Sequence, residues 1–322
     1  MKAEKVKSLS MDREYMVLRL KSMIPLLGLL LMVILFEIFS GGKLMAKRNL
    51  INILTQAYPI IIVSLGAAFV FSHGGMDLSY GGVLGVSILV TTIAAGMGVP
   101  VFLAILISIA VAVVCYLVNG FVSVYCNVSP FIACLCVLYI CRGILNTVCA
   151  KSRISIPVDM FKYDNWTLKI PVLIVVVIIS YLLFEKSKIG KASRAIGGNA
   201  LAAQQTGINV KQIKMFGYMI SAFAVGIASF FTMIRAGSVT TSTGQGLEMN
   251  IVTALVLGGI PLSGGSKVKI LGAILGALTV ILLRNGLIIT GVNERIVEGI
   301  QGVALLLIVF LTYSKNKNAL LN

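Results

Sequence analysis

Side chains able to do chemistry are few in this sequence, and they are scattered. His73 is the single histidine, and the six cysteines fall between Cys115 and Cys149 without a Cys-x-x-Cys pair. Zinc sites need several thiolates or imidazoles at short spacings, so we expect no metal site and no cofactor. The chain also lacks paired carboxylates at catalytic spacing, a nucleophile beside a base, and the Gly-x4-Gly-Lys-Ser/Thr loop that holds ATP phosphates. The sequence therefore predicts a protein that is not an enzyme and has no catalytic residue.

Some charged residues lie in or beside apolar runs, where a charge at a helix centre costs about 2.5–3.5 kcal/mol. We expect Asp77 to cap the following helix by accepting backbone N–H bonds, rather than to contact a solute. Glu248 is expected to open a short helix, where the helix dipole favours a carboxylate, or to pair with Arg284 across the bundle. The charged residues of this kind are Glu37, Asp77, Arg142, Glu248, Arg284 and Glu298.

A glycine-rich pattern occurs twice. Residues 74–81 and 258–265 share Gly-Gly-x-x-Leu-Ser-x-Gly, and each copy lies between two apolar runs. This predicts an internal, parallel repeat with both copies on one side of the membrane. Irregular backbone at membrane depth is tolerated only inside protein or beside a water-filled cavity, so the glycines mark either a solute pathway or tight packing. The candidate residues for the pathway or for helix breaks are Gly75, Asp77, Ser79, Gly81, Glu248, Gly258, Gly259, Ser263 and Gly264.

The composition shows what kind of elements must position these residues. Of the 322 residues, 58% are hydrophobic and 12% are charged, and the mean hydropathy is +1.00. Soluble domains are about half apolar and about a quarter charged, so a soluble enzyme is excluded. Intrinsic disorder is excluded as well, because its signature is low hydrophobicity.

Apolar runs of membrane-crossing length recur along the chain. A bilayer core about 30 Å thick needs roughly 20 apolar residues as a helix. The sequence therefore predicts an all-α, polytopic transmembrane bundle of about ten segments, some of them short or broken. They are expected near 22–40, 57–72, 79–96, 100–119, 130–149, 170–186, 215–235, 248–261, 269–289 and 296–313. The 248–261 segment is too short for an ordinary crossing and is expected to be a half-helix or a re-entrant piece.

The distribution of Lys and Arg sets the expected orientation. The net charge is +16, and with the N-terminus inside, the inner loops carry 16 basic residues and the outer loops eight. The positive-inside rule then places both termini in the cytoplasm. We expect a cytoplasmic segment at 1–21, a transmembrane domain at 22–313 and a cytoplasmic tail at 314–322. The basic residues are expected to serve topology and lipid headgroups, not nucleic acid.

The long inner loop at 186–214 contains a short helix with recognisable ends. Asn199 is an N-cap residue, and Gly207 can adopt the left-handed conformation that ends a helix. The two turns between them are about 10 Å long and marginal in isolation, so they are expected to pack against something. The loop is read as a docking element for a cytoplasmic partner, with a surface-lying connector as the alternative.

At these motifs the sequence resembles the membrane-spanning permease subunit of ribose-type, binding-protein-dependent ABC sugar importers. The resemblance rests on SHGGMDLSYGGVLG, AIGGNALAAQQTGINVKQIK and GQGLEMNIVTALVLGGIPLSGGSKVKILGAILGAL, in the same order and spacing over almost the whole chain. Gly197, Gly198, Asn199 and Gly207 match the loop that couples such permeases to their ATPase. The departures are Ala200, where the family often has an acidic residue, together with Tyr80 and the Ile260–Pro261 pair.

The resemblance implies partners and a cellular place. These are a cytoplasmic ABC ATPase subunit, an extracytoplasmic solute-binding protein, a second permease subunit in a homodimer or heterodimer, and the lipid bilayer of a bacterial cell membrane. The solute would be a sugar, and a nucleoside or a signalling carbohydrate is the alternative within the class. A stand-alone secondary transporter is the alternative from another class; it would need no docking helix but would need membrane-buried titratable residues.

Overall fold

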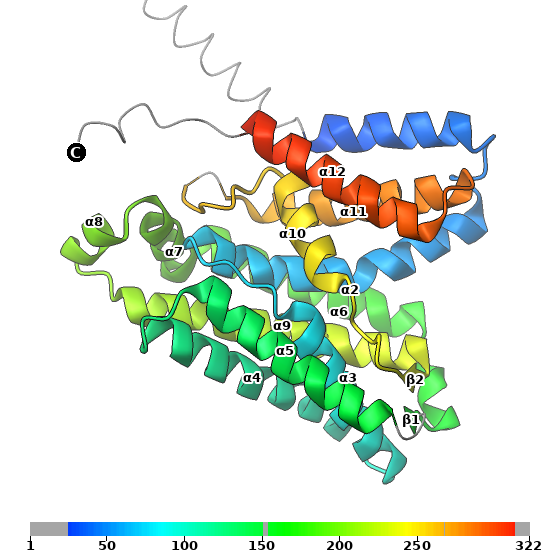
Figure 1. Cartoon of the computed structure of the whole chain (residues 1–322), viewed down its shortest axis with the longest axis horizontal. Helices are drawn as coiled ribbons and strands as arrows, with labels where there is room; N and C mark the ends of the chain where they lie inside the picture. The colour runs from blue at the N-terminus through cyan, green and yellow to red at the C-terminus, as the bar shows by residue number, and fades with distance from the viewer. Residues whose placement is uncertain (1–24, 151–153, 267, 313–322) are drawn as a thin grey trace, which may run out of the picture.

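A computed structural model describes residues 25–150, 154–266 and 268–312, and within them the chain is a helical bundle with one two-stranded sheet (Figure 1). The predicted all-α class is confirmed. The expected cytoplasmic pieces at 1–21 and 314–322 lie outside the described residues.

The helix Pro25–Phe39 comes first among the described elements. The elements after it are α2 (Lys47–Ser72), α3 (Tyr80–Gly96), α4 (Val101–Val124), α5 (Pro130–Cys149), β1 (Ile154–Ser155), η1 (Val158–Tyr163), α6 (Trp166–Tyr181), η2 (Leu182–Lys186), α7 (Lys188–Gly198), α8 (Ala200–Gln205), α9 (Val210–Ala236), β2 (Ser238–Val239), α10 (Leu247–Leu257), α11 (Ile270–Ile289) and α12 (Glu294–Thr312).

Each apolar segment predicted from the sequence coincides with a helix in the described part of the chain. Six of these helices are long and apolar enough to cross a membrane: α2, α4, α5, α6 with η2, α9 and α11. Pro25–Phe39, α3 and α10 are apolar but shorter. The α10 helix has 11 residues, as expected of a half-helix. A total of ten crossings remains a prediction.

Two helix starts differ from the sequence prediction. The segment expected at 57–72 belongs to α2, which begins at Lys47, so Pro59 lies inside the helix and not near its start. Pro171 likewise lies inside α6. The first turns of α2 carry polar residues, which an apolar window excludes, although they are helical.

The α2 and α9 helices form the centre of the bundle. In their most apolar stretches 78% and 72% of residues are buried, against 22% in α4 and 17% in α6. A helix that is apolar all round and little buried within the protein is typical of a membrane-facing span. We infer that α4 and α6 face lipid, while α2 and α9 hold the positions of the other elements.

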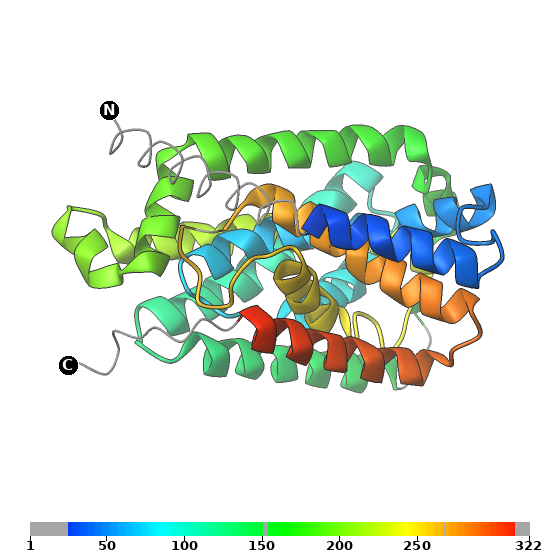
Figure 2. The ribbon, with the colours of Figure 1, turned by 90° about the horizontal axis from the view of Figure 1, so that it is seen from above.

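The two ends of the bundle differ. We call the end that carries α8 the α8 end, and the end that carries β1 and β2 the β end; they lie at opposite ends of the long axis (Figure 1). The α8 helix projects beyond the bundle in both views, while α7 lies beside the end of α2 (Figure 1, Figure 2). At the β end, Ile154 pairs with Val239 in the antiparallel sheet.

Candidate functional site

The two glycine-rich copies and the predicted docking loop meet at the α8 end. The Gly265 N–H donates to the Ser72 carbonyl oxygen at 2.9 Å. A Cβ atom at Gly264 would lie only 2.6 Å from the Gly74 nitrogen. The copies at 74–81 and 258–265 are therefore in contact at one end of the bundle.

Helix α7 is seated on this contact. The Ser193 hydroxyl on α7 and the Ser72 hydroxyl at the end of α2 lie 2.7 Å apart, and both side chains are buried. A Cβ atom at Gly197 would clash with the Ser72 carbonyl oxygen, whereas one at the neighbouring Gly198 would meet nothing within 4 Å. Of the two motif glycines, the first therefore packs inward and the second faces outward.

The other candidate glycines serve close approach or a turn. A Cβ atom at Gly75 would lie 2.7 Å from the His73 ring, and one at Gly258 would clash with the backbone of Gly272 on α11. Gly259 has a φ of +79°, in the left-handed region that favours glycine. At these positions the tight-packing alternative for the glycines is the one that the contacts support.

The short helix predicted within the 186–214 loop is present as α8. The Asn199 side chain accepts from the Ala202 N–H at 3.0 Å, so Asn199 is the N-cap. Gly207 follows with a φ of +84°. Ala203 is 5% exposed and anchors the helix, while Leu201 is 74% exposed.

A polar pocket of about 480 Å³ lies beside α8, between the end of α4 and the start of α9. Gly207 of the coupling motif is one of its lining residues. The lining is completed by Ser123, Val124, Asn127, Gln204, Ile208, Asn209, Val210, Lys211 and Lys214.

Asp77 lies in a buried network between α2 and α3. Its carboxylate accepts from the Ser79 N–H at 2.8 Å, the Ser79 hydroxyl at 2.7 Å and the Tyr116 hydroxyl at 2.9 Å. Asp77 is 0% exposed. The carboxylate holds Ser79, the residue that precedes α3, and accepts its N–H instead of an N–H of the helix, so Asp77 has a structural role here but does not cap α3 as expected.

His73 lies just past the end of α2. The side chain is 4% exposed, and neither ring nitrogen has a hydrogen-bond partner among the described residues. Burial and the nearby Lys214 ammonium lower the pKa of His73 to about 3. The imidazole therefore stays neutral at physiological pH and is a poor proton carrier.

The alternative considered for Glu248, a pairing with Arg284, is wrong. Arg284 forms an ion pair with Glu294 of α12. Glu248 lies in the first turn of α10, as expected, but its carboxylate is 3.8 Å from the Arg142 guanidinium of α5. The pairing depends on how α5, α10 and α12 pack, which spacing along the chain does not reveal.

Arg142 is a site residue that the sequence prediction missed, although its charge within an apolar run was the signal for it. Arg142 Nη1 donates to the Thr243 carbonyl oxygen at 2.7 Å. A Cβ atom at Gly81 would clash with the Glu248 carboxylate and the Gly244 carbonyl oxygen. Gly81 and Glu248 are thus brought together where α3 and α10 begin.

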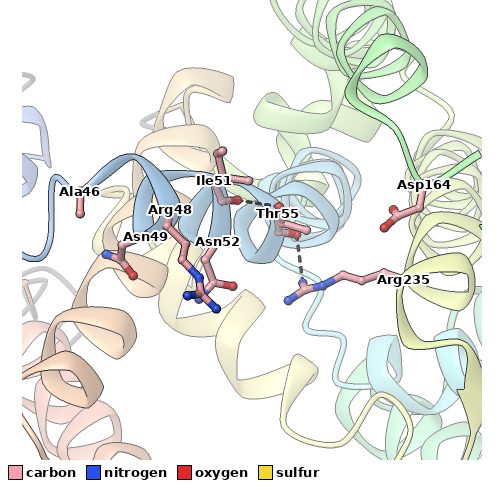
Figure 3. Close-up of a pocket in the computed structure, with 8 residues that line it drawn as sticks. All are labelled: Ala46, Arg48, Asn49, Ile51, Asn52, Thr55, Asp164 and Arg235. Atoms are coloured by element: carbon pink, nitrogen blue, oxygen red, sulfur yellow. Dashed lines mark hydrogen bonds between the residues drawn. The ribbon is translucent and has the colours of Figure 1, made fainter.

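A second polar pocket, of about 640 Å³, lies at the β end (Figure 3). The Arg48 and Arg235 guanidinium groups point into it from α2 and α9, and Arg235 Nη1 donates to the Thr55 carbonyl oxygen at 3.1 Å. Asp164 is the acidic residue in the lining. The other lining residues are Ala46, Asn49, Ile51 and Asn52.

Within the described ranges no group of three His, Cys, Asp or Glu side chains is placed to hold a metal ion. What the structure offers is a bundle of apolar helices, two of them bounded by irregular glycine-rich segments, with a capped helix projecting at one end. This arrangement defines a multi-pass membrane protein of the transporter class.

Comparison with known proteins assigns the family. Residues 49–309 match the model of the family described as branched-chain amino acid transport system / permease component. The chain belongs to this permease family, whose members are the membrane components of ABC transporters and not enzymes. Such permeases work with an ATPase and a binding protein.

Individual relatives carry more specific names. The chain is 30% identical to the ribose import permease protein RbsC of Bacillus subtilis, over 91% of this chain and 92% of that protein. It is 29% identical to the fructose import permease protein FruF of Bifidobacterium longum, over 91% and 88%. It is 28% identical to RbsC of Escherichia coli K12, over 83% and 86%. No solved structure matches the chain significantly.

Proposed function

We propose that this chain is the permease subunit of a bacterial ABC importer, with residues 22–313 forming the translocation pathway for a sugar or sugar-like solute. In this proposal a second permease subunit completes the pathway. The α8 end and both chain termini face the cytoplasm, where the ATPase binds. The β end faces outward, toward the solute-binding protein.

The observation that carries the proposal is the projection of α8. Asn199 caps α8, and the nearby Gly197 packs against the backbone of Ser72 and Gly265. A movement of α8 caused by the ATPase would therefore be transmitted to the contact between the two glycine-rich copies. Leu201 and the pocket beside α8 supply an apolar side chain and a polar recess for the ATPase.

The solute class rests on the relatives. The names of the relatives specify ribose and fructose, while the family description specifies branched-chain amino acids. Three named relatives that cover most of the chain favour a sugar. A nucleoside or a signalling carbohydrate shares the same hydroxyl chemistry and is the alternative cargo.

A stand-alone secondary transporter is less well supported by the buried groups. Asp77 is held by Ser79 and Tyr116, and His73 stays neutral. Both side chains are buried, at 0% and 4% exposed, and neither lines one of the two polar pockets. Energy from a separate ATPase accounts for the chain without requiring such a residue.

Substituting Leu201 tests the proposal. L201D places a charge on the exposed face of α8 and should abolish co-purification of the ATPase and ATP-driven D-ribose uptake by reconstituted vesicles, while the chain still inserts. L201M keeps the apolar contact and should behave as the parent. Normal ATPase binding by L201D, or uphill uptake by the chain without any ATPase, would contradict the proposal.

A further inference from the structure

The segment that leads into α10 is irregular and rich in hydroxyl groups. We call residues 240–245 the hydroxyl segment; it contains Thr240, Thr241, Ser242, Thr243, Gly244 and Gln245. Thr240 Oγ1 and Ser242 Oγ lie 3.1 Å apart, and the Thr240 N–H donates to Thr243 Oγ1 at 2.9 Å. Within it, Thr241, Ser242 and Gln245 are exposed.

This segment lies deep in the bundle. Arg142, which binds the Thr243 carbonyl oxygen, is about 18 Å from Pro130 and about 10 Å from Cys149 along α5, at about 1.5 Å of rise per residue. Thr243 also packs on Gly85, where a Cβ atom would lie 3.0 Å from its carbonyl oxygen. Since α5 is long and apolar enough to cross a membrane, Thr243 lies within the span of α5, whereas Thr240 directly follows β2 at the β end.

The segment is held in place from behind. Arg142 donates to Thr243 and faces Glu248, while Gly81 of α3 leaves no space between itself and Gly244. Arg142 Nη2 and Glu248 Oε2 have no hydrogen-bond partner among the described residues. The inner side is therefore fixed by close packing and charge, and the hydroxyl groups of the outer side are left exposed.

The exposed side cannot face lipid. Exposed polar side chains and non-helical backbone are tolerated at membrane depth only when buried in protein or next to water. On this face α10 lies between α12 and α5 (Figure 1). Within one chain, the hydroxyl segment is packed only on its inner side, against Arg142, Gly81 and Gly85. Its exposed side can be shielded from lipid only by a second polypeptide.

We propose that the hydroxyl segment is the solute-contacting lining of the pathway, closed by the same segment of a second copy of this chain. The inference rests on the proposed function. A two-fold arrangement places identical patches face to face, which would turn two open hydroxyl-rich faces into one polar channel. Thr241, Ser242 and Gln245 supply hydroxyl and carboxamide groups that both donate to and accept from the hydroxyls of a polyhydroxylated solute. Arg142 is a positioning residue that acts through Thr243.

Single cysteines in the complete complex test the lining. T241C, S242C and Q245C are reconstituted with the ATPase and binding protein and treated with a charged, water-soluble methanethiosulfonate. Labelling is read site by site by mass spectrometry, so the native cysteines stay in place. The matched control is I178C on α6, which is also exposed but lies on the opposite side of the bundle from α5 and α12 (Figure 2).

We expect the three hydroxyl-segment variants to react at least tenfold faster than I178C, and modified Q245C to lose ATP-driven D-ribose uptake. Oxidation of Q245C should also link two identical chains. Reaction as slow as that of I178C would overturn the lining, and a cross-link to a different polypeptide would overturn the second copy as its partner.

If a variant does not assemble, Q245A in the parent chain is measured instead: its KM for uptake should rise several-fold, and an unchanged KM would overturn the solute contact.

Failure of this inference is distinguishable from failure of the proposed function. If parent vesicles show ATP-driven uptake but the hydroxyl segment does not react, only the proposal that this segment lines the pathway is contradicted. Parent vesicles whose uptake is independent of the ATPase would sink the proposed function, whatever the cysteines show.

Discussion

The adjacent glycines Gly197 and Gly198 have different structural roles. Gly197 and Gly198 stand side by side in the same motif, but a Cβ atom at the first would collide with the backbone of α2 and one at the second would be free. Backbone cannot yield as the end of a flexible side chain can. The first glycine is therefore required for packing, and the second is available to a partner.

We predict that G197A separates α7 from α2, whereas G198A does not. Overpacking of this kind costs about 1–3 kcal/mol. G197A should lower the thermal unfolding midpoint of the purified chain in detergent and weaken ATPase co-purification. G198A is the control and should leave the midpoint unchanged. Equal midpoints for the two variants would show that the close contact of Gly197 with the Ser72 backbone does not contribute to stability.

At the scale of elements, the sequence predicted the helices better than their contacts. Each apolar run forms a helix, and the ends of α8 could be predicted because capping depends on neighbouring residues.

Helix α7 was missed because three glycines, Gly190, Gly197 and Gly198, give it poor intrinsic helix propensity. It is supported by the Ser187 cap, which accepts from the Ile189 N–H at 3.1 Å, and by its seat on α2. That seat is a contact between residues distant in sequence, as is the pairing of Arg142 with Glu248, and local patterns do not encode such contacts.

Helices α10 and α11 approach each other through small residues. A Cβ atom at Gly276 would clash with the Ala254 carbonyl oxygen of α10. Close backbone approach through glycine is a common way for membrane helices to associate. The half-helix α10, which carries Glu248, therefore has its position set largely by α11.

We predict that G276A destabilises the chain by about 1–3 kcal/mol and displaces α10. Thermal unfolding in detergent measures the loss. G302A on α12 is the control, since a Cβ atom there would meet nothing within 4 Å and alanine favours the helix. A midpoint for G276A equal to that of G302A would mean that the two helices can separate without cost.

The molecule as a whole has two unlike ends joined by the α2 and α9 helices. At the α8 end, α2 finishes against α7; at the β end, α2 and α9 contribute Arg48 and Arg235 to one pocket. The same two buried helices thus reach both proposed partner surfaces. A signal between a partner at one end and a partner at the other has a continuous, packed route through them.

The charge of the β-end pocket gives a prediction at this scale. The proposed outer partner is a soluble protein, and two guanidinium groups in an open polar pocket attract acidic side chains. The double variant R48E/R235E should weaken association of the solute-binding protein with the reconstituted complex by tenfold or more. Because exposed charges are screened by salt, the difference from the parent should shrink as ionic strength rises. Surface plasmon resonance on nanodisc-embedded complex measures both effects.

R295E is the matched control for this prediction. Arg295 is exposed at the start of α12, also toward the β end, but it does not line the pocket. Reversing it changes the charge of the end by the same sign without altering the recess. R295E reverses one charged residue, and the double variant reverses two. If R295E weakened binding as much as the double variant, general electrostatic attraction and not the pocket would hold the partner. If neither variant had an effect while uptake remained ATP-driven, the binding protein would dock elsewhere on the β end.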